Sequence, residues 1–208
     1  MNTRSYDSPA RAAASAEKRA RVVAAAMALL REGDKVTAVS LEAVAKAAGV
    51  TRLTVYNQFG SRCGLLEAVL EQLAHDTGMD QVGQVIAREK PRAALDKLID
   101  MICHTWGYDE SMGKLHAAAL IDPEFAEAIN ARMERRRGAL RFLVTRIRAD
   151  KPVGDTEMTD LVDLLFAQTS YPVFTSLRAA GRTPEAVAAL MKYGCHAAIA
   201  SAAKLNAA

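Results

Sequence analysis

Apolar residues recur along most of this chain at the three-to-four-residue spacing of an amphipathic helix, and no segment alternates as a strand does. The first periodic segment runs from about Glu17 to Arg31 and ends before Gly33. Another begins at Ser61, which is a suitable N-cap, and ends by Gly78. Only 5% of the residues are aromatic and alanine is abundant, so runs that favour strands are scarce. The pattern predicts an all-α fold.

The most informative region is residues 39–58, where two short periodic segments lie on either side of Gly49. Glycine adopts the left-handed conformation that ends a helix without a steric penalty. Thr51 is a suitable N-cap for the second segment, in which Val55 and Phe59 have the i,i+4 spacing of a buried face. Two short helices joined in this way form a helix-turn-helix, and the second helix of that motif reads the DNA major groove.

After residue 79 the periodic segments become longer, and the turns between them lack a distinctive pattern of the kind formed by Gly49 and Thr51. Helices are expected to begin near Pro91, Lys114, Pro123, Thr156 and Pro184, which gives about nine helices in the whole chain. The helix from Thr156 contains Pro172 in its middle, where proline removes a hydrogen bond and kinks the helix.

The predicted organisation has three parts. A flexible basic arm at 1–15 precedes a three-helix helix-turn-helix domain at 16–78, and residues 79–208 form a second, helical domain. Residues 1–62 contain ten Lys and Arg but five Asp and Glu, whereas the whole chain carries a net charge of only +3. A basic front end on a nearly neutral body is typical of a phosphate-binding module attached to a regulatory domain.

Two further features concern the compartment. No apolar run approaches the ~20 residues of a membrane span, and the polar N-terminus lacks the apolar core of a secretory signal. The three cysteines are odd in number and widely spaced, which argues against a disulfide framework. We expect a cytoplasmic protein.

The run from Ala48 to Phe59, followed by Ser61-Arg62 and Leu65-Leu66, resembles the N-terminal domain of TetR-type transcriptional regulators. The usual string of that family is Ala-Gly-Val-Ser-Lys-Gly-Thr-Leu-Tyr-x-x-Phe, then Ser-Lys and a leucine pair, and it aligns here without gaps. The resemblance covers about the first third of the chain. It implies an N-terminal helix-turn-helix domain, a C-terminal domain for ligand binding and dimerisation, and operator DNA as a partner.

The resemblance and the polar face of the second helix together predict the DNA contacts. Tyr56 matches a family tyrosine that bonds a backbone phosphate, and Arg62 replaces a lysine at the start of the fourth helix. Arg52 has the forked guanidinium that pairs with guanine. The predicted DNA-binding residues are Ser40, Leu41, Thr51, Arg52, Leu53, Thr54, Tyr56, Asn57 and Arg62.

The chain departs from the family pattern at two places. Leu53 stands where the family prefers a small residue, and it either contacts a thymine methyl or crowds the groove. Cys63 and Gly64 replace the acidic pair that usually starts the fourth helix. Glycine at position 64 is expected to cost about 1 kcal/mol of helix stability relative to alanine.

A small-molecule effector site is predicted in the second domain, where most bulky groups of that domain have polar neighbours. Each of these residues alone is compatible with an ordinary position in the hydrophobic core. Together they provide the apolar lining and the few polar groups of a ligand pocket. The run Arg135-Arg136-Arg137 is expected to be a solvated face. The candidate effector-binding residues are His104, Trp106, Tyr108, Met112, His116, Phe142, Phe166, Gln168, Thr169, Tyr171 and Phe174.

The last helix is rich in small residues around Leu190, Met191 and Ile199, and such helices approach one another closely. The resemblance implies a homodimer through the last two helices of each subunit. The alternative is that this helix packs only within its own monomer.

These observations predict a ligand-responsive transcriptional regulator, a repressor that binds a palindromic operator as a dimer and is released by a small molecule. No catalytic motif, phosphate loop or cofactor signature supports an enzyme. The cysteines and histidines of the second domain lack the spacing of a metal site. Two alternatives stay open: a helical oligomeric protein that binds small molecules, and a metal- or redox-sensing regulator that uses Cys63, in the first turn of a helix, or the other Cys and His residues.

Overall fold

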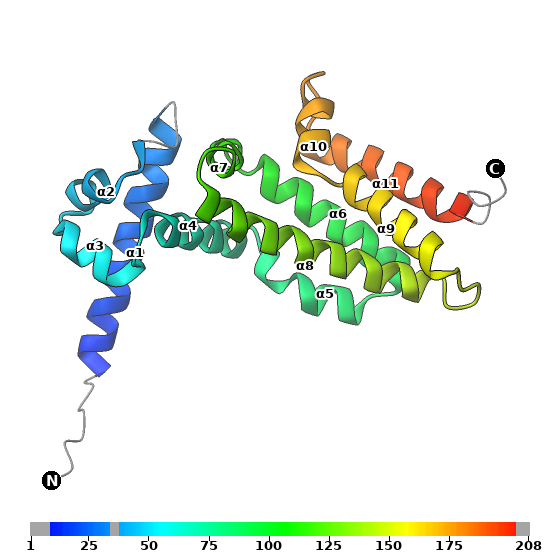
Figure 1. The fold of residues 1–208 in the computed structure, drawn as a ribbon, viewed down its shortest axis with the longest axis horizontal. Helices are drawn as coiled ribbons and strands as arrows, with labels where there is room; N and C mark the ends of the chain where they lie inside the picture. The colour runs from blue at the N-terminus through cyan, green and yellow to red at the C-terminus, as the bar shows by residue number, and fades with distance from the viewer. Residues whose placement is uncertain (1–8, 34–37, 203–208) are drawn as a thin grey trace, which may run out of the picture. The chain divides into compact units, whose positions relative to one another are not determined.

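The computed structural model describes residues 9–33 and 38–202, with only the backbone of residues 9–11. Every regular element within these ranges is a helix, so the predicted all-α fold is confirmed (Figure 1). The helices are α1 (Pro9–Glu32), α2 (Leu41–Ala48), α3 (Arg52–Phe59), α4 (Arg62–Asp76), the 3₁₀ helix η2 (Met79–Gln81), α5 (Val82–Arg88), α6 (Pro91–Gly107), α7 (Ser111–Ala119), α8 (Pro123–Ile147), α9 (Asp155–Gln168), α10 (Tyr171–Arg178) and α11 (Pro184–Ser201).

Two sequence expectations need correction. Helix α1 begins at Pro9, so the second half of the expected arm at 1–15 is helical, because its alanine-rich sequence favours a helix after proline. Residues 1–8 lie outside the described residues. The single helix expected from Thr156 through Pro172 is two helices, because the backbone of Ser170 is extended and α10 starts afresh at Tyr171. Pro172 therefore occupies the first turn of α10, where its missing N–H costs nothing, and it does not kink a longer helix.

The chain divides into two compact units. The first, called here the N-terminal unit, comprises the residues up to Gln72 together with Glu110–Phe125, and the C-terminal unit comprises Leu73–Asp109 and the residues from Ala126 onward. The sequence pattern had placed the boundary at residue 78 and α7 in the second domain. Helix α7 instead belongs with the N-terminal unit, because it packs against α1.

The core of the N-terminal unit is aliphatic. Helix α1 packs against α2, and α2 packs against α3, so that one apolar face of each helix is removed from water. Burying a Val or Leu side chain contributes roughly 1.5–3 kcal/mol, so a few such residues per helix hold these short elements in place. The fully buried aliphatic side chains include Val22, Ala26, Leu30, Val44, Val55, Leu65, Leu66 and Val69.

The core of the C-terminal unit is centred on the seam between α6 and α11. Leu95 and Ile99 of α6 are buried there, as are Cys195 and Ile199 of α11. Polar side chains close the edge of the same seam, since the His196 imidazole Nε2 lies 2.7 Å from Asp96 Oδ1. Helix α11 also packs against α9, and α5 packs against α6.

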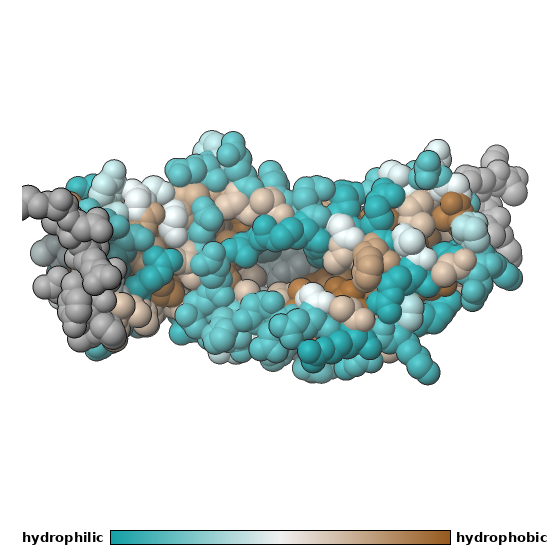
Figure 2. All heavy atoms as spheres, turned by 90° about the horizontal axis from the view of Figure 1, so that it is seen from below, coloured by the Kyte–Doolittle hydropathy of each residue, from teal (hydrophilic) through white to brown (hydrophobic). Residues whose placement is uncertain are grey.

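The face of the molecule drawn in Figure 2 is largely polar. In the face drawn in Figure 2, hydrophilic residues cover most of the area, and hydrophobic residues show only in patches between them. Among the described residues, no helix combines the length and the apolar character needed to cross a bilayer.

Candidate nucleic-acid interface and ligand site

The turn between α2 and α3 has the geometry that the sequence predicts. Gly49 adopts φ 66° and ψ 36°, and its N–H is directed at the carbonyl oxygens of Ala45 and Lys46. The Thr51 hydroxyl accepts a hydrogen bond of 3.1 Å from the Thr54 N–H and thereby caps α3. These local bonds fix the start of α3, because they satisfy backbone groups that a helix end leaves unpaired.

Ser40 and Leu41 stand at the start of α2. The Ser40 hydroxyl accepts a hydrogen bond of 3.1 Å from the Ala43 N–H, so it caps the helix as predicted. Leu41 is half-buried and begins the helix. Both residues therefore have a structural role in placing α2, whatever they touch outside the protein.

Helix α3 separates into a buried and an exposed face. Val55 and Phe59 are buried in the N-terminal unit, as the i,i+4 spacing predicts. On the opposite face, Tyr56 is 54% exposed and Leu53 is 65% exposed. Thr54 is half-buried, whereas Thr51, Arg52 and Asn57 are exposed. The exposed face thus carries a guanidinium, a phenol and an amide, which are the groups that bind phosphates and base edges.

Helix α1 also holds the end of α3, a contact for which the sequence contains no signal. The Arg19 guanidinium donates a hydrogen bond of 3.1 Å to the Gln58 carbonyl and lies 4.4 Å from the centre of the Phe59 ring. A cation at the last carbonyls of a helix is stabilised by the helix dipole. Arg19 thus fixes the C-terminal end of the exposed helix.

Arg62 has partners inside the N-terminal unit. Its Nε donates to the Val39 carbonyl at 2.8 Å, and its Nη1 lies 3.1 Å from Asp122 Oδ2. The other oxygen of Asp122 accepts the Phe125 N–H at 3.2 Å and so caps α8. The residue that the sequence assigned to a phosphate therefore joins the start of α2, the start of α4 and the α7–α8 turn.

The structure supplies a steric reason for glycine at position 64, and the sequence alone does not reveal it. A Cβ at this position would lie 2.2 Å from the Phe59 carbonyl oxygen, which is backbone and has no alternative rotamer. The Gly64 N–H donates to the Ser61 hydroxyl at 3.1 Å, so Ser61 caps α4. The expectation that alanine would be better here is wrong, because the tight α3–α4 turn leaves no room for a side chain.

Cys63 is buried beside this turn. Burial, followed by a hydrogen bond to Glu67, raises the pKa of the Cys63 thiol to about 12. The thiolate is the reactive form of cysteine, so this environment suppresses oxidation and metal binding at neutral pH. The fold does not provide the low-pKa thiol that a redox sensor at Cys63 requires.

A second contact within the N-terminal unit was also missed from the sequence. The Lys114 ammonium of α7 donates hydrogen bonds of 2.8 Å to the carbonyl oxygens of Leu30 and Arg31. These are carbonyls of the last turn of α1, where a cation is favourable. Lys114 therefore attaches α7 to the end of α1.

The predicted effector residues do not all come together. Met112 and His116 lie on α7 in the N-terminal unit. In the C-terminal unit, Phe142 is 50% exposed on α8. His104 and Tyr108 are both exposed, with their ring centroids 6.2 Å apart. Phe142, His104 and Tyr108 are not part of the aromatic cluster described next.

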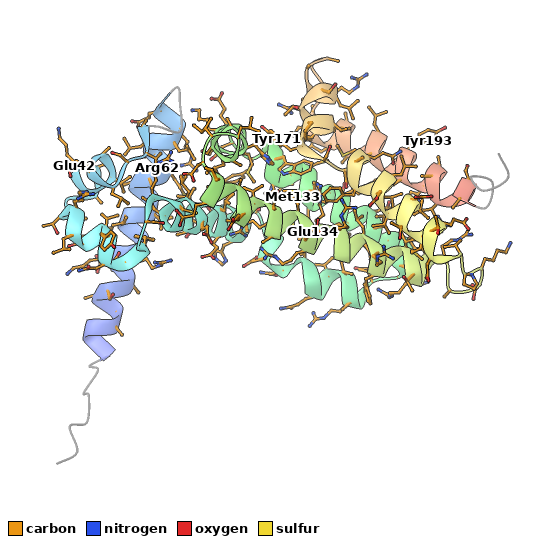
Figure 3. All side chains as sticks on the ribbon, in the orientation of Figure 1. Glu42, Arg62, Met133, Glu134, Tyr171 and Tyr193 are labelled. Atoms are coloured by element: carbon orange, nitrogen blue, oxygen red, sulfur yellow. The ribbon has the colours of Figure 1, made fainter. Side chains whose placement is uncertain are left out.

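The other candidates form an aromatic cluster in the C-terminal unit, which we call the ring cluster: Trp106, Phe166, Tyr171 and Phe174. The Trp106 centroid lies 5.7 Å from that of Tyr171 and 5.6 Å from that of Phe174. The Tyr171 and Phe174 rings stack with centroids 6.3 Å apart (Tyr171 is labelled in Figure 3). Offset and edge-to-face pairs at these distances are favourable aromatic contacts.

The group that links Phe166 to this cluster is Arg136, which the sequence treated as part of a solvated run. Its guanidinium carbon lies 4.3 Å from the Phe166 centroid and 5.6 Å from the Trp106 centroid. Its Nη1 donates to the Thr169 carbonyl, and its Nη2 lies 3.5 Å from the Phe166 carbonyl. The sequence contains a signal for the partial burial of Arg136, since this residue is one helical turn from Leu140, which is fully buried.

Gln168 and Thr169 complete this region. The Thr169 hydroxyl donates a hydrogen bond of 2.8 Å to the Leu165 carbonyl, so its one O–H is already used by α9. The Gln168 Oε1 is shielded from solvent and has no hydrogen-bond partner among the described residues. A Cβ at Gly194 of α11 would lie 3.4 Å from this oxygen, so the side chain is directed at α11. Within the described residues, no three His, Cys, Asp or Glu side chains are grouped so as to hold a metal ion.

Comparison with known proteins agrees with this geometry. Residues 22–69 match the family model described as bacterial regulatory proteins, tetR family. The fold is similar to that of NalD, the secondary repressor of the MexAB-OprM multidrug efflux pump in Pseudomonas aeruginosa, with a TM-score of 0.68, 21% identity, and coverage of 89% of this chain and 96% of that chain.

Two other solved structures are similar. A transcriptional regulator from Rhodococcus sp. Rha1 gives a TM-score of 0.66 at 18% identity and covers 88% of this chain and 96% of its own. RolR in complex with resorcinol gives a TM-score of 0.53 at 19% identity, with coverage of 93% of this chain and 97% of that chain. No curated protein sequence is significantly similar to this chain.

Proposed function

We propose that this protein is a transcriptional repressor that a small-molecule effector releases from its operator, because residues 22–69 match the family model described as bacterial regulatory proteins, tetR family. The observation that carries the proposal is the exposed polar face of α3, presented by a helix whose other face is buried. A recognition helix needs this division, because one face must be fixed while the other enters the major groove.

On this proposal Arg52, Leu53 and Asn57 contact base edges, and Tyr56 bonds a phosphate. Arg52 has the geometry to pair with guanine, and the Leu53 side chain is apolar and exposed, as contact with a thymine methyl requires. Thr51 and Thr54 lie at the helix start, where backbone N–H groups also favour phosphate. Ser40, Leu41 and Arg62 contribute mainly by holding α2 and α4 in position.

The operator is proposed to be palindromic and the protein a homodimer. In such a dimer two α3 helices would enter successive major grooves about 34 Å apart. The proposed dimer surface is formed by α11 with α9, where Leu164 is 39% exposed, Leu190 43% and Tyr193 78% (Tyr193 is labelled in Figure 3). Exposed apolar side chains on adjacent packed helices favour pairing with a second copy.

The effector is proposed to bind at the ring cluster. The cluster combines four aromatic side chains with the polar groups of Arg136 and Gln168, as small-molecule sites do. RolR was crystallised with resorcinol, a small phenol. Release from DNA follows if the effector binds more tightly to a conformation that does not fit the operator. The tetR family and the similar structures are regulators, and we propose no catalytic activity.

The test is DNA binding by the purified full-length protein, measured by fluorescence anisotropy with the promoter fragment upstream of its own gene. We expect DNA binding to weaken steeply as the salt concentration rises. We also expect the unlabelled promoter fragment to compete for binding far better than random DNA. Equal competition by random DNA, with a folded protein, would contradict the proposal. That result would favour the alternative of a helical oligomer that only binds small molecules.

A further inference from the structure

Arg136 is a half-buried cation without a counter-charge. Among the described residues, no carboxylate forms an ion pair with its guanidinium. Its neighbour Arg137 contacts the same Phe166 ring at 4.1 Å but is paired with Asp163 and with Glu134, whose Oε1 lies 3.4 Å from Arg137 Nε. Two adjacent arginines thus share one aromatic ring, and only one of them has its charge balanced.

The contacts of Arg136 leave the Nε–H of the guanidinium without an acceptor. The two Nη atoms are directed at the Thr169 and Phe166 carbonyls, whereas Nε is shielded from solvent and has no hydrogen-bond partner. Burial lowers the pKa of Arg136 to about 10, with Arg137 as the second cause, so the group is still cationic at neutral pH. A buried charged donor without an acceptor is costly, so such a group calls for an acceptor from a water, an ion or a ligand.

The surroundings of this cation indicate what the ligand carries besides its anionic group. Trp106 and Phe166 lie close to the guanidinium, and Tyr171 and Phe174 continue from Trp106 as stacked and edge-on rings. Arginine binds a carboxylate through two parallel N–H···O bonds, and aromatic walls bind a planar apolar body. Neutral phenols would occupy the rings but leave the guanidinium unbalanced.

We propose that the effector is an aromatic carboxylate whose anionic group pairs with Arg136 and whose ring packs in the ring cluster. This inference rests on the proposed function, since it names the ligand class of the same site. A rival explanation is that Arg136 only caps the end of α9 through the two carbonyls. Capping alone predicts a loss of thermal stability on substitution but no preference among ligands.

The experiment compares matched ligands on the full-length protein by calorimetry and thermal shift. The probes are benzoate, 2-naphthoate and indole-3-acetate, each with its neutral amide of the same shape. We expect at least one carboxylate to bind at least tenfold more tightly than its amide and to raise Tm. Equal affinity within every pair, or no binding by any carboxylate, would overturn the proposal.

Three variants locate the effect. Arg136→Met keeps an unbranched apolar stem of four atoms and removes the charge, so the carboxylate preference should disappear. Arg137→Met is the matched control, and it should retain the preference because that arginine is already paired. Arg136→Lys keeps a charge without the fork, so it should keep part of the preference even if the methionine variant folds poorly. A full preference in Arg136→Met, or its loss only in Arg137→Met, would overturn the assignment.

The same carboxylate is then added to the operator complex. Dissociation of the DNA is expected, and binding that leaves the complex intact would overturn the effector role. Failure of the ligand-free protein to bind its operator would instead remove the proposed function. The two failures are therefore distinguishable.

Discussion

The Arg62 guanidinium and the Asp122 carboxylate, 60 positions apart in sequence, form an ion pair of 3.1 Å inside the N-terminal unit. Both side chains are less than a third exposed, and Arg62 also donates to the Val39 carbonyl. The pair therefore ties the α7–α8 turn to the helix-turn-helix. It gives the segment 110–125 a direct connection to the elements that place α3.

The first prediction concerns this pair. Arg62→Ala should lower the free energy of unfolding by about 1–3 kcal/mol, because it removes charge-assisted hydrogen bonds from a half-buried site. Asp122→Asn should have a smaller effect in the same direction, since asparagine still caps α8. Urea unfolding of both variants measures the effect.

The same variants separate positioning from phosphate contact. If Arg62 acts by positioning, both substitutions weaken operator binding and the slope of affinity against salt stays unchanged. A slope reduced by about one unit in Arg62→Ala, with normal binding by Asp122→Asn, would show that Arg62 contacts a phosphate.

The second prediction concerns Lys114. Lys114→Met should cost about 1–2 kcal/mol of stability, because it removes two hydrogen bonds from a cation to the last carbonyls of α1. Lys114→Arg keeps the charge and should recover most of the loss. Thermal unfolding of the two variants is the measurement, and an unchanged Tm in Lys114→Met would refute the role.

The third prediction concerns Gly64. Gly64→Ala should destabilise the protein by about 1–3 kcal/mol, although alanine is the better helix former, because its Cβ meets the Phe59 carbonyl oxygen. Gly138→Ala in α8 is the control, since a Cβ there meets nothing within 4 Å. The control should be neutral or stabilising by up to about 1 kcal/mol. Similar effects at both positions would contradict the steric explanation.

The fourth prediction separates two kinds of DNA contact on α3. Arg52→Ala should cost about 1–3 kcal/mol of operator affinity and relax the preference for guanine at one position of each half-site. Tyr56→Phe should weaken binding to every sequence similarly and leave the salt slope unchanged, because the lost group is uncharged. Anisotropy titrations on a set of single-base operator variants would check both, and a sequence-independent effect of Arg52→Ala would count against base contact.

The fifth prediction concerns alkaline pH. Burial raises the pKa of the Cys63, Cys103 and Cys195 thiols to about 12 each. Between pH 9 and 12 the unfolded state releases these protons while the native state keeps them, so the native state binds more protons and stability falls as pH rises. The free energy of unfolding falls by at most about 1.4 kcal/mol per pH unit for each thiol.

A variant with all three cysteines replaced by alanine is the control for this effect. Its stability should fall less steeply above pH 9 than that of the native sequence, as measured by urea unfolding. The native thiols should also react slowly with a disulfide reagent at pH 8 unless the protein is unfolded. Rapid reaction in the folded state would restore the redox-sensing alternative.

The sequence by itself determined what depends on neighbours along the chain. Helical periodicity, the caps at Ser40 and Thr51, and the left-handed turn at Gly49 all arise from contacts within a few residues. The buried positions Val55 and Phe59 follow from the same spacing, and so does the exposed face of α3. These features predicted the helix-turn-helix that the structure contains.

Only the tertiary structure decided which distant groups meet. Arg62 and Asp122 belong to different motifs, and neither has a local signal for the other. Arg136 looks like its neighbours in a basic run, yet its guanidinium bonds to the carbonyl at the end of α9, whereas Arg137 pairs with carboxylates. From the sequence, Gly64 is a poor helix residue. In the structure the Phe59 carbonyl oxygen occupies the space that a Cβ at position 64 would need. Periodicity records which face of a helix is buried, but the identity of the partner depends on how the helices are packed in three dimensions.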